Sequence, residues 1–133
     1  MVQARREFIL YLAFSVLLLS FDRTYAIFSH GVSSLSMTLM FLPVLLGGLV
    51  FVLLRALMKH RLYKHRLYRL FTFLYHSSIA LFVNGMLVKG ILEIAGTGSK
   101  YIVIFQLLAG MLAIVSCGVL YMIIKGKNKI KRA

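Results

Sequence analysis

The sequence contains few acidic residues, one cysteine and one proline. Asp and Glu account for only 3 of the 133 residues, against 16 Lys and Arg, so the formal net charge is +13. The single cysteine, Cys117, excludes an internal disulfide framework and any metal site built from several cysteines. One proline and ten glycines, spread along apolar stretches, do not match the low hydrophobicity of a disordered chain.

Apolar residues, in contrast, are in large excess. They make up 61% of the chain, compared with about 45–50% in a soluble globular domain. A soluble domain of this size could not bury so much apolar surface, because small domains keep a large ratio of surface to volume. The composition therefore predicts a membrane protein in which residues 1–133 form one domain.

Four apolar stretches are long enough, or nearly so, to cross a membrane. A helix needs about 20 apolar residues to span the hydrocarbon core. The stretches cover residues 8–28, 35–54, 70–94 and 101–124. None alternates polar and apolar residues as barrel strands do, and lipid offers no partners to an open backbone. We predict an all-α integral membrane fold with four transmembrane helices, arranged as two in–out–in hairpins.

The distribution of basic residues predicts the orientation. Thirteen of the 16 Lys and Arg residues lie in the N-terminal segment, the 55–69 connection or the 125–133 tail. Only Arg23 and Lys100 fall in the opposite connections. Because Lys and Arg concentrate on the cytoplasmic side, we predict that both termini and the 55–69 connection are cytoplasmic. The setting that we expect is a bacterial cytoplasmic membrane.

The N-terminal stretch has a competing interpretation as a signal peptide. Two arginines precede an apolar core over residues 9–19, and Thr24-Tyr25-Ala26 resembles a small-residue cleavage site. Cleavage after Ala26 would leave three spans. We favour four spans, because Tyr25 and the charged Asp22-Arg23 pair suit a cleavage region poorly. The intact mass of the mature protein distinguishes the two interpretations.

Small residues and one proline are the predicted helix-packing positions, since close approach of small residues drives helix association in lipid. They are Pro43, Gly47, Gly48, Ala109, Ala113 and Cys117. The last three form a stripe at four-residue spacing. We expect a kink at Pro43, because a proline within a helix removes one backbone hydrogen bond.

Polar residues within the spans are costly and therefore informative. They are Asn84, Lys89, Glu93, Gln106 and His76. Lys89 and Glu93 are four residues apart and can pair on one helix face. A tight antiparallel turn centred on residue 98 would place Gln106 level with Gly90. Two interpretations remain open: these residues join the helices, or they line a path for a solute or proton.

A second polar group is expected on the outer side. Asp22 and Arg23 leave the first span there, and His30 belongs to the turn that follows. Together with Lys89 and Glu93, these residues could form one outer polar cluster.

The 55–69 connection contains a tandem duplication, in which the pentapeptide of residues 59–63 recurs at residues 64–68. Its basic side chains are predicted to contact anionic lipid headgroups: Lys59, Arg61, Lys64, Arg66 and Arg69. An acidic protein partner is the alternative, and no nucleic-acid partner is expected.

No catalytic motif is present. The sequence has no carboxylate pair spaced for acid–base work, no nucleophile with a base and no glycine-rich phosphate loop. We therefore predict no enzyme activity, no metal site and no cofactor. His76 is the only histidine within a span, so a haem would have to be shared across an interface between chains.

Three functions follow from these features. The leading one is a non-catalytic accessory subunit of a larger membrane complex, such as a transporter or sensor, because so little of the chain lies outside the spans. The first alternative is a homo-oligomeric channel or carrier that uses the intramembrane polar residues. The second is a redox subunit with haem bound by His76 at an interface.

Overall fold

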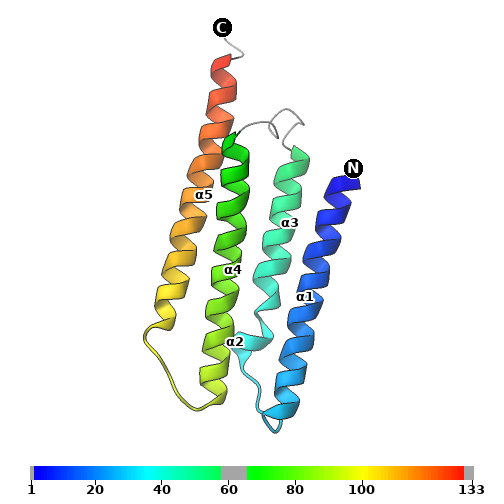
Figure 1. The fold of residues 1–133 in the computed structure, drawn as a ribbon, viewed down its shortest axis with the longest axis vertical. Helices are drawn as coiled ribbons and strands as arrows, with labels where there is room; N and C mark the ends of the chain where they lie inside the picture. The colour runs from blue at the N-terminus through cyan, green and yellow to red at the C-terminus, as the bar shows by residue number, and fades with distance from the viewer. Residues whose placement is uncertain (1, 58–65, 131–133) are drawn as a thin grey trace.

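The computed structural model describes residues 2–57 and 66–130, and all regular structure in these ranges is helical. The helices are α1 (Val2–Phe28), α2 (Leu35–Thr38), α3 (Phe41–Leu57), α4 (Arg66–Ile94) and α5 (Ile102–Ile130). The start of α1 and the end of α5 lie at the same end of the molecule (Figure 1), which we call the terminal end. The loops after α1 and α4 lie at the opposite end, the turn end.

The predicted all-helical class is confirmed. Four segments are long and apolar enough to cross a membrane: residues 5–28, 35–57, 67–94 and 102–125. Each matches one predicted span to within a few residues. Large apolar side chains such as Phe73 and Ile114 point outward, with 69% and 74% of their surface exposed. These features are consistent with a multi-pass membrane protein.

The second apolar stretch is two helices rather than one kinked helix. α2 ends at Thr38, and α3 begins at Phe41 after a turn at residues 39–40. Pro43 therefore lies in the first turn of α3, where a backbone N–H has no partner within the helix in any case. The predicted kink at Pro43 is wrong, because the chain breaks before the proline.

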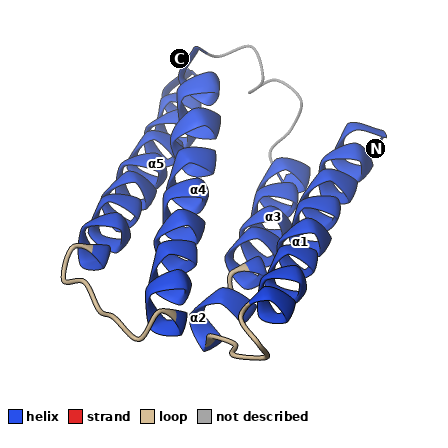
Figure 2. Ribbon diagram, turned by 60° about the horizontal axis from the view of Figure 1, so that its bottom comes forward, coloured by secondary structure: helices blue, strands red, loops and turns tan. Residues whose placement is uncertain are grey.

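The helices form two pairs, α1 with α3 and α4 with α5 (Figure 2). Gly48 allows the first pair to approach closely, since a Cβ added there would overlap the Tyr11 ring of α1. The adjacent Gly47 faces the other pair instead. Its carbonyl oxygen accepts a hydrogen bond of 2.7 Å from the Tyr75 hydroxyl of α4. The two neighbouring glycines thus serve two different helix contacts.

A seven-residue repeat governs the contact between α4 and α5. The buried residues of α5 are Ile102, Ala109, Ser116 and Ile123, and those of α4 include Phe71, Ser78 and Gly85. The seam is hydrogen-bonded at its centre, where Ser78 Oγ donates to the Ala109 carbonyl oxygen at 2.9 Å. Such a repeat is typical of helices that pack at a shallow left-handed crossing.

The predicted stripe on α5 needs correction. Ala109 is buried and Ala113 is half-buried, but Cys117 is exposed. A helix turns by 100° per residue, so a four-residue step advances the face by about 40°, whereas a seven-residue step returns within about 20°. The contact therefore continues to Ser116 instead of Cys117.

The predicted register of α4 and α5 is also wrong. A turn centred on residue 98 would place Gly85 beside Met111, but a Cβ added at Gly85 would meet Phe105. The connection after α4 climbs back along the molecule, so α5 begins part-way along α4 and extends past it at the terminal end (Figure 1). Gln106 consequently lies near the level of Gly85, away from Lys89.

Candidate functional site

At the turn end, α2 is held between the two helix pairs by acidic residues. On one side, the Asp22 carboxylate of α1 accepts a hydrogen bond from Thr38 Oγ1, with both oxygens 3.3 Å away. Asp22 is only 3% exposed, and Arg23 Nε lies 4.0 Å from it. On the other side, Glu93 of α4 accepts from the hydroxyls of Ser34 and Ser36.

The turn-end contact is also tightly packed. Met37 and Met40 are each 1% exposed, and Met37 covers Gly90 of α4. A Cβ added at Gly90 would lie 2.7 Å from Met37 Cβ and 3.1 Å from its backbone nitrogen. Because backbone atoms are involved, the glycine is required for α2 to lie this close to α4. The turn end is therefore closed.

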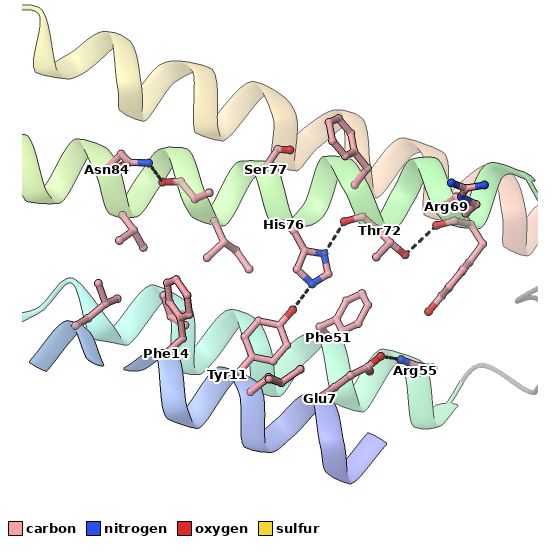
Figure 3. A pocket seen from close by; sticks show the side chains of 18 of the residues that line it. Glu7, Tyr11, Phe14, Phe51, Arg55, Arg69, Thr72, His76, Ser77 and Asn84 are labelled. Carbon is pink, nitrogen blue, oxygen red and sulfur yellow. Dashed lines mark hydrogen bonds and ion pairs between the residues drawn. The ribbon is translucent and has the colours of Figure 1, made fainter. Parts of the chain in front are cut away.

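Further from this end, a groove of about 1190 Å³ lies between α1, α3 and α4 (Figure 3). Each of the three helices contributes both polar and apolar residues. They include Glu7, Leu10, Tyr11, Phe14 and Leu18 of α1, Val44, Phe51 and Arg55 of α3, and residues from Tyr68 to Leu87 of α4. The groove is the candidate functional site of the described part of the chain.

An ion pair lies at the terminal end of the groove. Glu7 of α1 pairs with Arg55 of α3, and their side chains are 27% and 14% exposed. The second carboxylate oxygen of Glu7 is buried, and no hydrogen-bond partner for it lies among the described residues. Arg69 of α4 is exposed and lines the same end of the groove.

One hydrogen bond crosses the middle of the groove. Tyr11 Oη lies 2.5 Å from His76 Nε2, and the two rings stack with their centroids 5.8 Å apart. The other ring nitrogen, Nδ1, lies 2.6 Å from the Thr72 carbonyl oxygen. A carbonyl oxygen can only accept, so Nδ1 carries the hydrogen and Nε2 accepts from the tyrosine hydroxyl. We call this contact the Tyr11–His76 bridge.

Beyond the bridge, toward the turn end, the lining becomes apolar. It consists there of Phe14, Leu18, Val44, Ile79, Ala80, Val83 and Leu87, with the single amide of Asn84. That amide donates to the Ala80 carbonyl oxygen of its own helix at 3.0 Å. The groove is therefore polar in its terminal half and apolar in its turn half.

The intramembrane polar residues predicted from the sequence separate into two places. His76 and Asn84 line the groove, whereas Lys89 and Glu93 pair at the turn end, with 3.7 Å between Nζ and Oε1. Gln106 is half-buried on α5 and does not line the groove.

The outer cluster and the basic connection are placed in part. Asp22 joins the turn-end contacts, but no hydrogen bond or ion pair among the described residues joins His30 to them. His30 is exposed in the turn after α1, with a φ of 57°. Lys59, Arg61 and Lys64 lie outside the described residues, and the backbone of Arg66 begins α4.

Sequence analysis missed Glu7, Tyr11 and Arg55. The signal for the ion pair was available, because Glu7 and Arg55 lie near the same ends of consecutive antiparallel spans and Glu7 is one of only 3 acids. Tyr11 carried no comparable signal. It pairs with a histidine 65 residues away, and that pairing depends on how the helix pairs dock.

Comparison of the chain with protein-family models, with curated proteins and with solved structures found no match. The functional argument therefore rests on the groove. Among the described residues, no three His, Cys, Asp or Glu side chains are grouped so that they could hold a metal ion. A haem iron could take His76 Nε2 only if Tyr11 moved away, since that nitrogen is already hydrogen-bonded.

Proposed function

We propose that this chain is a non-catalytic accessory subunit of a membrane complex, and that it binds a hydrophobic ligand in the groove. The observation that carries the proposal is the groove itself, about 1190 Å³ in volume and largely apolar. Ligand sites are typically concave, apolar and about 300–1,000 Å³ in volume, with a few placed polar groups. The groove matches this description and slightly exceeds the usual volume.

Its polar groups suit binding better than chemistry. Glu7 pairs with Arg55, and Tyr11 pairs with His76, so each group already has a partner within the protein. These contacts hold three helices at fixed positions around the groove. In the proposed orientation, the terminal end faces the cytoplasm, because that is where the basic residues are concentrated.

The accessory role follows from how little of the chain lies outside the four long helices. Of the described residues, only short connections fall between α1 and α2 and between α4 and α5. A partner that carries out transport or sensing would supply the rest of the function. The native mass of protein purified gently from its own membrane tests this point. A second chain should accompany the 15.1 kDa protein, whereas a simple multiple of that mass would favour self-assembly.

Filling the groove tests ligand binding. Ala80 lines the groove on α4, so Ala80→Phe should displace the ligand. Ala13 of α1 is also exposed on a helix but does not line the groove, so Ala13→Phe is the matched control. We expect mass spectrometry to find co-purifying hydrophobic ligand on the wild type and Ala13→Phe, with most of it absent from Ala80→Phe. Equal retention by both variants would refute ligand binding in the groove.

A further inference from the structure

We infer that the ligand is a phospholipid with an anionic headgroup, which lies with its headgroup at the terminal end of the groove. The inference rests on the proposed function and adds the chemical class and direction of the ligand. Its basis is the division of the lining into a polar half and an apolar half. A phospholipid has the same division, with a charged headgroup at one end and acyl chains at the other.

The charge at the terminal end favours an anion. Three charged residues line the groove: Glu7, Arg55 and Arg69. Glu7 and Arg55 neutralise each other as an ion pair, which leaves the positive charge of Arg69. Arg69 is exposed, and it forms no hydrogen bond or ion pair with another described residue. A guanidinium group is well suited to bind a phosphate through two parallel hydrogen bonds.

The hydroxyl and ring groups next to Arg69 extend the polar region. Tyr68 and Thr72 lie beside it on α4, and both line the groove. The Thr72 hydroxyl already donates to the Tyr68 carbonyl oxygen at 2.9 Å, so its oxygen remains able to accept from a ligand. The polar region then ends at the Tyr11–His76 bridge (Figure 3).

The length of the apolar half fits an acyl chain. From His76 to Leu87, α4 covers about 16 Å at 1.5 Å per residue. One leaflet contributes about half of a hydrocarbon core that is about 30 Å thick. The apolar half of the groove is therefore about as long as one leaflet is deep.

The Tyr11–His76 bridge favours a lipid over a helix of a partner protein. Residues on both sides of the bridge line one continuous groove, and the bridge crosses it between α1 and α4. A helix is about 10–12 Å wide with its side chains, so it could enter only by breaking the bridge. A flexible acyl chain can pass beside the bridge without breaking it.

The experiment uses the full chain in nanodiscs of phosphatidylcholine and phosphatidylglycerol in equal amounts, followed by native mass spectrometry of the retained lipid. We expect the wild type to retain phosphatidylglycerol preferentially. Arg69→Gln should reduce that preference about fivefold, the effect of one basic residue near an anionic surface, without lowering the total lipid retained. Arg69→Lys should keep most of the preference.

Lys125→Gln is the matched control, because Lys125 is an exposed basic residue on α5 that does not line the groove. We expect its lipid preference to equal that of the wild type. An unchanged preference in Arg69→Gln, or no preference in the wild type, would overturn the inference while leaving hydrophobic-ligand binding intact. Retention of no lipid by the wild type would overturn the proposed ligand binding itself. A co-purifying protein chain that displaces lipid from the groove would show that a partner helix binds there.

Discussion

At the turn end, α2 fills the space between the two helix pairs, whereas toward the terminal end the same space forms the groove. The turn end is closed by the most buried methionines and by hydrogen bonds from Asp22 and Glu93 to α2. In the middle of the groove, by contrast, a single hydrogen bond joins α1 to α4. The pairs are thus fastened firmly at one end and lightly along the rest of their length. The difference shows where a ligand can enter without disturbing the fold.

The largest effect should come from loosening the closed end. Gly90→Ala places a methyl group 2.7 Å from Met37 Cβ and against the backbone of α2. We expect it to lower the free energy of unfolding by about 1–3 kcal/mol, the usual cost of overpacking. Gly118→Ala is the control, because nothing lies within 4 Å of a Cβ added there. Replacing that glycine should raise helix stability by about 0.5–1 kcal/mol.

Thermal unfolding of both variants in one detergent provides the measurement. The midpoint should fall for Gly90→Ala and should stay equal or rise for Gly118→Ala. If the two variants unfold at the same temperature, α2 does not lie closely against α4.

A smaller effect is expected from removing the Tyr11–His76 bridge. Tyr11→Phe keeps the ring but leaves His76 Nε2 without its donor. Hydrogen bonds between membrane helices are worth about 0.5–2 kcal/mol, so stability should fall by about that amount. Tyr121→Phe is the control, since Tyr121 is 63% exposed on α5 and does not line the groove. The ¹⁵N chemical shift of His76 Nε2 should change only in Tyr11→Phe, and an identical shift in both variants would argue against the bridge.

The smallest effect should come from Lys89→Ala. The Lys89 and Glu93 side chains are 45% and 40% exposed, and exposed ion pairs contribute about 0–1 kcal/mol. Glu93 also keeps its bonds to Ser34 and Ser36. Ser34→Ala should be more harmful, because it removes both a bond to Glu93 and the N-cap of α2, a loss of about 0.5–2 kcal/mol. Unfolding measurements should rank the two variants in that order. A loss of solute flux from vesicles in Lys89→Ala would instead support a channel or carrier.

The helices could be predicted because hydrophobic spans depend on local composition alone. Residues 70–94 and 101–124 are apolar over the length of a bilayer, and α4 and α5 cover them. The break before Pro43 could not be predicted in the same way. It depends on Ser34 as the N-cap and on the hydrogen bond between Thr38 and a carboxylate in another helix.

The groove could be predicted only in part. His76 and Asn84 were recognised because polar groups are costly in a membrane, and both line the groove. Tyr11 and Phe51 are ordinary members of apolar stretches, so no local feature separates them from lipid-facing aromatics. The packing seam is an intermediate case. The seven-residue spacing of Ile102, Ala109, Ser116 and Ile123 is visible in the sequence, but the buried face is not.

The stagger between α4 and α5 has a consequence at the far end of the molecule. Both helices contain 29 residues, so a late start for α5 becomes an overhang where the chain finishes. None of the other described helices reaches as far (Figure 1). The final turns of α5 therefore form a free-standing stalk. A tag or reporter fused there would be kept at a distance from the rest of the protein, without the need for an added spacer.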